Sequence, residues 1–246
     1  MMMEDYWDKL FKKNQPTWME NWYEELKDYT IKSSYFRLNQ KEVNAMIEKG
    51  IGRYYNNEEM RNIVVNIEKA RIELNYSSLF VRLGSRSPKD IDTMKYSTFI
   101  SMLCDSGRVL EDLMLCSKVN YNPYIFLRKN IRMEKRNEFR CFVKDNKLVG
   151  ISQYFYRDRY YHIDDDNVRE HIIDGAERLL QKIIDKINLK DFVFDIYYRR
   201  DKDLPLLIEL NPWSDWTDSC LFDWATDNFE NFEFRWFFER ERRKKR

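Results

Sequence analysis

Two acidic residues interrupt apolar strands near the C-terminal end of the chain. The segment DFVFDIYY (191–198) carries Asp195 inside an apolar run, and LPLLIELNPW (204–213) carries Glu209 and Asn211. Because alternate residues of a strand point to one face, Glu209 and Asn211 share a face of the predicted hairpin, and Asp195 can join them there. Carboxylates are costly to bury unpaired. This face therefore requires a cation, an arginine or solvent.

The kinds of side chain available narrow the choice of cation. Two carboxylates and one amide oxygen suit Mg²⁺, which takes few protein oxygens and completes its octahedron with water and phosphate oxygens. The chain has two histidines and four cysteines without CxxC spacing, which argues against a zinc or iron site. Mg-ATP held by Asp195, Glu209 and Asn211 is therefore one interpretation of the pattern. An ordinary ion pair with Arg128 or Arg140 is an equally good interpretation of the residues alone.

Charge and composition exclude some classes of partner. Lysine and arginine number 43 against 42 aspartates and glutamates, so no global field favours nucleic acid or an acidic membrane. Because the sequence shows neither a signal peptide nor an apolar run of about 18 residues, we expect a cytoplasmic protein with reduced thiols. The basic run ERERRKKR (239–246) is expected to be a solvated helix end or frayed tail, with nucleic acid or an acidic protein patch as the alternative.

The pattern of apolar residues predicts an α+β protein with an N-terminal lobe over 1–122 and a C-terminal lobe over 123–246. A capping box is expected at Thr17 with Glu20. Asn39 is expected to cap the start of another helix, which Gly50 can end at its C′ position. Asp145-Asn146 suits a two-residue hairpin turn. Helices are predicted over 4–13, 17–27, 40–50, 58–74, much of 88–117 and 166–187. Strands are predicted over 29–38, 78–83, 124–129, 138–144, 147–155, 191–198 and 204–213, those from 124 onward forming an antiparallel sheet.

Several longer stretches resemble the cell division cycle protein 123 (D123) family. They are NEFRCFVKDNKLVGISQ (137–153), DFVFDIY (191–197) and IELNPWSDWTDSCLFDW (208–224), with weaker similarity in LFVRLGSRSPKD (79–90). Members of this family adopt a two-lobed ATP-grasp fold with a mainly antiparallel C-terminal sheet. The resemblance covers roughly 28–224 and implies that Asp195, Glu209 and Asn211 hold the phosphates and Mg²⁺ of ATP.

The resemblance also implies a set of nucleotide contacts outside the metal cluster. Arg82 stands where the family usually has a phosphate-contacting lysine, and it can still bind phosphate in a bidentate manner. The neighbouring strands add further candidates. For Arg128 and Arg140 the alternative is an internal salt bridge to Glu138 or Asp195. The full set of expected cofactor-binding residues is Arg82, Arg128, Lys129, Arg140, Gln153, Asp195, Glu209 and Asn211.

The chain departs from the family pattern after Arg82. The motif that usually runs lysine, leucine, asparagine, tryptophan, serine is here RLGSRS (82–87), before Pro88-Lys89-Asp90. Arg86 and Lys89 either join a phosphate cradle or flank a loop. The chain is therefore identified as a divergent member of the family.

The family role implies a function in assembling eukaryotic translation initiation factor 2, through ATP-dependent binding of its gamma subunit. The alternative is an ATP-grasp ligase, or a phosphoryl- or nucleotidyl-transfer enzyme acting on a protein, RNA or small molecule. Nucleotidyl transfer requires a nucleophilic lysine. Arg82 at the nearest position argues against covalent adenylation there, whereas Lys129 is an alternative nucleophile. A third possibility is a binding module that uses ATP only as a structural ligand. Trp213, Trp216 and Trp224 either line its partner face or belong to the core or a pocket wall. Under each of the three hypotheses we expect a monomer.

Overall fold

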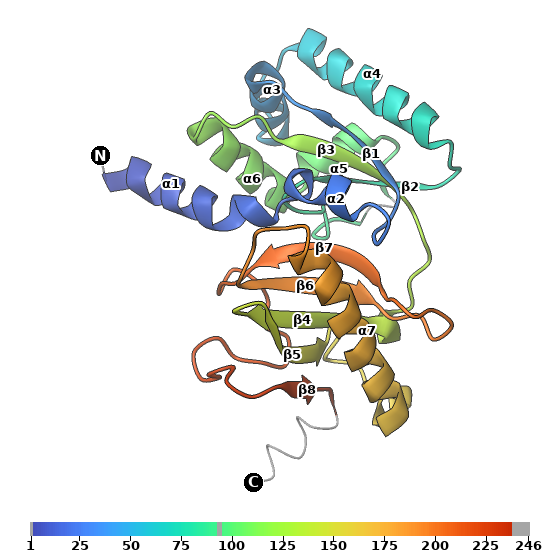
Figure 1. Cartoon of the computed structure of the whole chain (residues 1–246). Coiled ribbons are helices and arrows are strands. Elements are labelled where there is room, and N and C mark those ends of the chain that lie inside the picture. Colours follow the sequence, from blue (N-terminus) through green and yellow to red (C-terminus); the bar gives the residue numbers. More distant parts are fainter. Residues whose placement is uncertain (1, 93–94, 238–246) are drawn as a thin grey trace. The chain divides into compact units, whose positions relative to one another are not determined.

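The computed structural model describes residues 2–92 and 95–237 (Figure 1). The basic run 239–246 lies outside these residues. The chain divides into two compact units, one formed by Met1–Glu20 with Lys32–Asn130 and the other by Asn21–Ile31 with Ile131–Arg246. The first unit thus extends past residue 122 because the strand that follows pairs inside it.

The first unit is built on a three-stranded antiparallel sheet of order β1-β3-β2. One face of this sheet is apolar: Val81 and Leu83 lie beside Leu127 and Ile125, and all four are buried in the main core of the unit. Helices cover this core. The elements are α1 (Met2–Asn14), η1 (Gln15–Thr17), β1 (Ser33–Arg37), α3 (Gln40–Gly50), α4 (Asn57–Leu74), β2 (Leu79–Leu83), α5 (Phe99–Asp105), α6 (Gly107–Lys118) and β3 (Tyr124–Lys129).

The second unit is built on a five-stranded sheet of order β7-β6-β4-β5-β8, antiparallel except for the β5–β8 pair. The long helix α7 packs against β5 and buries an apolar stripe that includes Ile172, Leu179 and Ile183 (Figure 1). The elements are α2 (Tyr23–Leu26), η4 (Lys135–Asn137), β4 (Glu138–Lys144), β5 (Lys147–Gln153), η5 (Tyr161–Asp164), α7 (Asp166–Ile184), β6 (Phe192–Tyr197), β7 (Leu206–Pro212) and β8 (Glu233–Arg235).

Local sequence signals form as predicted at two places. Asp145 and Asn146 both have positive φ, 50° and 60°, which is what a tight two-residue hairpin turn between β4 and β5 requires. At the start of α3, Asn39 accepts a hydrogen bond from the backbone N–H of Glu42, whose carboxylate accepts one from the Asn39 N–H. This capping box holds the first turn of α3.

Two predictions about local structure are wrong. The expected capping box at Thr17 does not form, because the Thr17 hydroxyl donates to the Asn14 carbonyl and Glu20 is directed elsewhere. Short helical turns, including η2 (Met19–Asn21), stand in place of the single helix predicted over 17–27. The strand Tyr124–Lys129 does not join the sheet of β4 and β5 but lies between β1 and β2. Its partners are set by long-range packing of its apolar face, which local patterning does not reveal.

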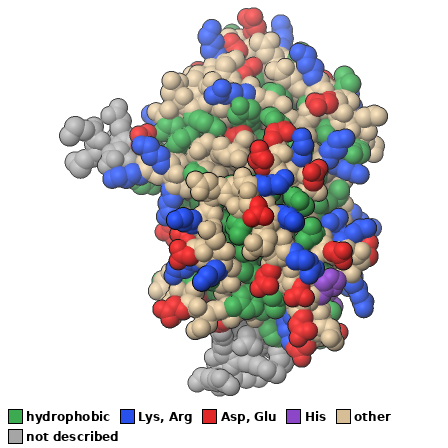
Figure 2. All heavy atoms as spheres, in the orientation of Figure 1, with side chains coloured by type: hydrophobic (Ala, Val, Ile, Leu, Met, Phe, Trp, Pro, Cys, Tyr) green, Lys and Arg blue, Asp and Glu red, His purple; other side chains and the backbone are tan. Residues whose placement is uncertain are grey.

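The surface carries both signs of charge. Lys and Arg side chains are mixed with Asp and Glu over the face shown in Figure 2, in keeping with a formal net charge of +1. Across residues 2–92 and 95–237, none of the helices has the length and apolar character needed to span a bilayer.

Candidate functional site

A row of polar side chains crosses the sheet of the second unit. Arg140 on β4 lies opposite Asp195 on β6, and Asp195 lies opposite Glu209 on β7; on the other side of Arg140, β5 contributes Ser152. Because directly opposed residues project to the same face, the four side chains share one face of the sheet. The hairpin expected from the sequence therefore forms in the register that brings the two carboxylates together.

Arg140 and Asp195 form a bidentate ion pair inside this row. Nε and Nη2 of Arg140 donate to the two oxygens of Asp195, each at 2.8 Å, while Nη1 donates to the Asp218 carbonyl at 2.5 Å. The side chains are only 4% and 2% exposed. Burial alone would lower the pKa of Arg140, but attraction and hydrogen bonding to Asp195 outweigh it and raise the pKa well above its usual value. Arg140 therefore keeps its positive charge beside the Asp195 carboxyl group.

The third expected ligand lies beside this pair. Asn211 is two residues from Glu209 on β7, and its Nδ2 donates to Oδ2 of Asp195 at 3.3 Å. Glu209 is itself buried, at 7% exposure. Asp195, Glu209 and Asn211 thus share one face, and their two carboxylates and one amide oxygen are the hard oxygen donors that Mg²⁺ takes in small number. Within the described ranges, no group of three or more His, Cys, Asp or Glu side chains could hold a metal.

Gln153 is placed away from this row. It lies opposite Phe139, one residue beyond Ser152, so its side chain points to the other face of the sheet. Its Nε2 donates to the carbonyls of Phe155 and Asp158 at 2.7 and 2.6 Å, and its Oε1 accepts from the Phe237 N–H. The amide organises the chain after β5.

Aromatic rings accompany the polar row. Phe142 follows Arg140 by two residues on β4 and contacts the rings of Trp213 and Trp224, which are 5.1 Å apart, centroid to centroid. Trp216 differs, since it is 60% exposed. Tyr154 was not predicted as a site residue, although the centroid of its ring lies 4.9 Å from the Arg140 guanidinium. Its position directly after the motif that ends in Gln153 was the sequence signal that could have identified it.

The expected phosphate contacts of the first unit fall on two faces of its sheet. Arg82 on β2 lies opposite Phe126 on β3, and Arg128 follows Phe126 by two residues on β3. Both arginines therefore occupy the face of the sheet away from the apolar core. Each is 3% exposed. Lys129 points to the opposite face, is exposed, and places Nζ 4.5 Å from the centroid of the Tyr76 ring. Arg82 and Arg128 are therefore grouped, and Lys129 is apart.

The loop after Arg82 is held by ion pairs and caps. Arg86 binds Asp112 on α6 through Nε and Nη2, with distances of 2.6 to 3.0 Å, and donates to the Arg108 carbonyl. Asp90 accepts from the hydroxyl of Ser106 at the start of α6. Arg86 therefore flanks and anchors the loop, which is one of the two roles predicted for it.

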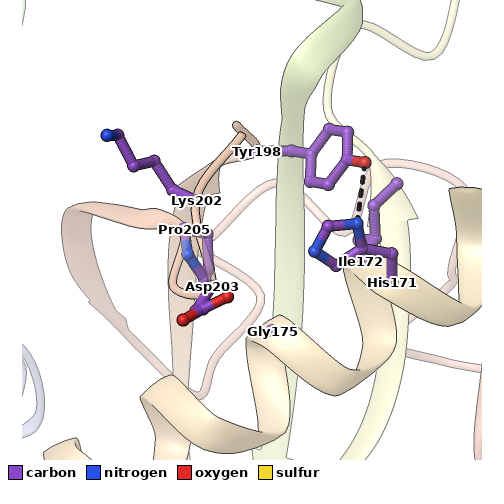
Figure 3. A pocket seen from close by; sticks show the side chains of 7 residues that line it. All are labelled: His171, Ile172, Gly175, Tyr198, Lys202, Asp203 and Pro205. Atoms are coloured by element: carbon purple, nitrogen blue, oxygen red, sulfur yellow. Dashed lines mark hydrogen bonds between the residues drawn. The ribbon is translucent and has the colours of Figure 1, made fainter. Parts of the chain in front are cut away.

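A small hollow in the second unit lies outside the predicted set. It is bounded by α7 and the segment after β6, and the Tyr198 hydroxyl lies 3.3 Å from Nδ1 of His171 across it (Figure 3). The other residues that line the hollow, labelled in Figure 3, are Ile172, Gly175, Lys202, Asp203 and Pro205. None of its lining residues belongs to the polar row.

Comparison with protein families decides the membership of the chain. A family model described as D123 matches residues 56–235. The chain belongs to the D123 family. This range includes the polar row of the second unit and the arginine-bearing strands β2 and β3, so the resemblance expected from the sequence motifs is confirmed.

Individual relatives agree with the family match. The "translation initiation factor eIF2 assembly protein" of Xenopus tropicalis is 40% identical over 166 residues, which are 60% of this D123 chain and 48% of that protein. That of Dictyostelium discoideum is 30% identical over 189 residues, or 70% and 48% of the two chains. The D123 chain spans about half the length of the curated relatives it matches.

A solved structure supports the fold. The structure of Cdc123 from Schizosaccharomyces pombe matches with a TM-score of 0.74 and 25% sequence identity, covering 90% of this chain and 95% of that one. The predicted α+β fold class is thereby confirmed.

Proposed function

We propose that this D123 protein binds Mg-ATP as an ATP-grasp protein, with Asp195, Glu209 and Asn211 as the Mg²⁺ ligands. The observation that carries the proposal is the placement of these three side chains on one face of β6 and β7, with the Asp195 carboxylate already neutralised by a cation. Two buried acidic residues side by side on apolar strands are costly unless a positive charge offsets them. Mg²⁺, when bound, neutralises phosphate charge and orients the triphosphate.

Arg140 has two tasks in this proposal. In the free protein it is the counter-ion of Asp195, and when nucleotide is present one of its donors turns to a phosphate oxygen, since a guanidinium offers five N–H groups. In the first unit, Arg82 and Arg128 are the proposed phosphate contacts, because they share a face. Lys129 and Gln153 lie on the opposite faces of their sheets and are weaker candidates.

The biological role proposed here is help in assembling translation initiation factor 2 through its gamma subunit. It is supported by the family match and by relatives named as eIF2 assembly proteins, one of them 40% identical. Binding without turnover fits this role. The position of Lys129 weakens the alternative of nucleotidyl transfer through a covalent lysine intermediate.

Calorimetric titration with Mg-ATP tests the nucleotide site. We expect the wild-type chain to bind and both Asp195→Ala and Glu209→Gln to bind at least tenfold more weakly, since each removes a charged ligand. The exposed α7 residues Asp174 and Glu177 supply the matched controls Asp174→Ala and Glu177→Gln, which should bind as wild type. Unchanged affinity in both site variants would overturn the assignment.

Nucleotide analysis and a binding assay test what the ATP does. Incubation with Mg-ATP should leave the nucleotide intact, and the purified gamma subunit of translation initiation factor 2 should be retained in its presence. Steady release of ADP or AMP that Asp195→Ala abolishes would instead support a ligase or transferase. Failure to retain the gamma subunit, with ATP binding intact, would refute the assembly role alone.

A further inference from the structure

Glu20 occupies space that Gly84 leaves open. The two residues lie in the first unit, where the N–H of Met19 donates to the Gly84 carbonyl at 3.0 Å. A Cβ atom on residue 84 would overlap Oε2 of Glu20 and lie 2.8 Å from its Cδ. A larger residue, such as the asparagine usual in the family motif, would therefore exclude the carboxyl group from its present position.

The carboxyl group of Glu20 is enclosed but incompletely satisfied. The Tyr121 hydroxyl donates to Oε1 at 3.1 Å and is itself approached by Nε2 of Gln15 at 3.4 Å. Oε2 is shielded from solvent and has no hydrogen-bond partner. Burial raises the pKa of Glu20 to about 7, although hydrogen bonds from its own backbone N–H and from Tyr121, and the charge of Arg82, oppose the rise. A proton can therefore be gained or lost here near neutral pH.

Arg82 approaches the same glycine from its own strand. Its Nε donates to the Leu83 carbonyl at 2.9 Å and its Nη2 to the Ser85 carbonyl at 3.2 Å, so the guanidinium binds the backbone on both sides of Gly84. The cation and the carboxyl group are thus held against one short turn. The positive charge of Arg82 acts on this carboxyl group, since it opposes the rise in the pKa of Glu20.

The other titratable groups around Glu20 do not change charge near neutral pH. Tyr121 and Cys116, at and near the C-terminal end of α6, both have a pKa raised well above the usual value, chiefly by burial, and remain protonated. Glu20 is the member of this group that can titrate.

We propose that Glu20 is a positioning residue for Arg82, and that Glu20 takes up a proton from solvent when a phosphoryl anion binds the Arg82 guanidinium. In the free protein the carboxylate and Arg82 attract each other across the Gly84 turn. A bound phosphate offsets the positive charge of Arg82, so the negative form of Glu20 loses its stabilisation and the protonated form is favoured. By linkage, phosphate binding is tightest when Glu20 is protonated. This inference rests on the proposed role of Arg82 in binding ATP.

Proton uptake during Mg-ATP binding is the direct test. Titrations of the whole chain at pH 7, in buffers that differ in ionisation enthalpy, count the protons exchanged. If the anion raises the proton affinity of Glu20 tenfold, wild type takes up about 0.4 proton more than Glu20→Gln, and its affinity falls about fivefold more from pH 6 to pH 8. Glu177→Gln, an exposed control, should behave as wild type. Equal proton uptake in wild type and Glu20→Gln would overturn the proposal while leaving the ATP site intact.

A second measurement on the free protein does not require ATP binding. Unfolding free energies of wild type, Glu20→Gln, Arg82→Gln and the double variant, measured at pH 6 and pH 8, give the interaction between the two residues. We expect that interaction to be favourable at pH 8 and weaker at pH 6, where Glu20 is protonated. If Mg-ATP fails to bind wild type, the ATP site is refuted; an interaction that does not change with pH refutes the coupling of Glu20 to Arg82.

Discussion

Arg140 binds both carboxylate oxygens of Asp195 at 2.8 Å in the middle of the second sheet, where neither side chain is more than 4% exposed. The two ordinary interpretations of the sequence, an ion pair and a metal ligand set, are thus compatible. An arginine in this position offsets the charge of the acidic row while the site is free, and it stands beside the residues proposed to hold Mg²⁺.

Removing Arg140 should destabilise the protein strongly. In Arg140→Ala, Asp195 loses two charge-assisted hydrogen bonds while it stays buried, and breaking a buried ion pair in this way costs about 3–5 kcal/mol. Urea unfolding monitored by circular dichroism measures the loss. The exposed Arg178→Ala, on α7, is the control and should cost less than about 1 kcal/mol.

A double replacement separates stability from binding. Arg140→Met with Asp195→Leu removes both charges together, so we expect most of the lost stability to return while Mg-ATP still binds at least tenfold more weakly than to wild type. If the double variant is as unstable as Arg140→Ala, the important contacts of Arg140 are those to the Asp218 carbonyl and the Tyr154 ring, not the ion pair.

Arg128 and Lys129 are neighbours with opposite orientations, and their variants should differ. Arg128→Gln should weaken Mg-ATP binding by tenfold or more, since it removes a buried cation from the face that carries Arg82. Lys129→Gln should change affinity less than twofold, because its ammonium group lies over Tyr76 on the other face. Calorimetric titration compares the two. A larger loss in Lys129→Gln would contradict the grouping by face.

Arg86 should matter for stability and little for nucleotide. It is bound to Asp112 through several short hydrogen bonds, and such bonds to charged groups contribute about 1.5–3 kcal/mol when partly buried. We expect Arg86→Ala to lose stability in this range and to keep its Mg-ATP affinity at a temperature where it is folded. A selective loss of affinity would instead assign Arg86 to the phosphate cradle.

Strand alternation and turn chemistry predicted a large part of the second unit. Asp195 and Glu209 lie on neighbouring apolar strands, and only hairpin pairing in the right register was needed to bring them together. The β6–β7 pair has that register, with Asp195 opposite Glu209. Applied to β5, the same alternation would have placed Gln153 on the face away from Ser152 and Arg140. Local rules were sufficient there.

Other features depend on residues that are far apart in the sequence. Thr17 with Glu20 has the same local pattern as Asn39 with Glu42, yet only the second forms a capping box. The difference is tertiary, since the carboxyl group of Glu20 packs against Gly84 and Tyr121. Pairing of β3 with β1 and β2 is likewise long-range, and no local periodicity encodes it.

The raised pKa of Glu20 predicts a specific dependence of stability on pH. Between pH 4.5, the ordinary value, and about 7, the folded protein keeps the proton on Glu20 whereas the unfolded chain releases it. The stability of wild type should therefore fall across this range relative to Glu20→Gln, by about 2.5 kcal/mol between pH 5 and pH 8, and level off above pH 8. Urea unfolding at several pH values measures the difference. Parallel pH profiles for the two proteins would show that Glu20 titrates normally.

A methyl group at position 84 should displace the carboxyl group of Glu20 and destabilise the protein. In Gly84→Ala the new methyl group overlaps the Glu20 carboxyl group, so that carboxyl must leave its enclosed position beside Tyr121. We expect a loss of about 1–3 kcal/mol, as for other overpacked sites. The φ angle of Gly84 is not positive, so the backbone itself accepts alanine and the effect is steric.

Shortening Glu20 should remove the cost of the added methyl group. In a Glu20→Ala background, Gly84→Ala should cost less than about 0.5 kcal/mol, giving a strongly non-additive double-mutant cycle in urea unfolding. Gly52→Ala is a useful contrast because its φ of +71° makes the substitution costly for the backbone, whatever residue stands at position 20. Additive effects of Glu20→Ala and Gly84→Ala would mean that the two residues do not share the space described here.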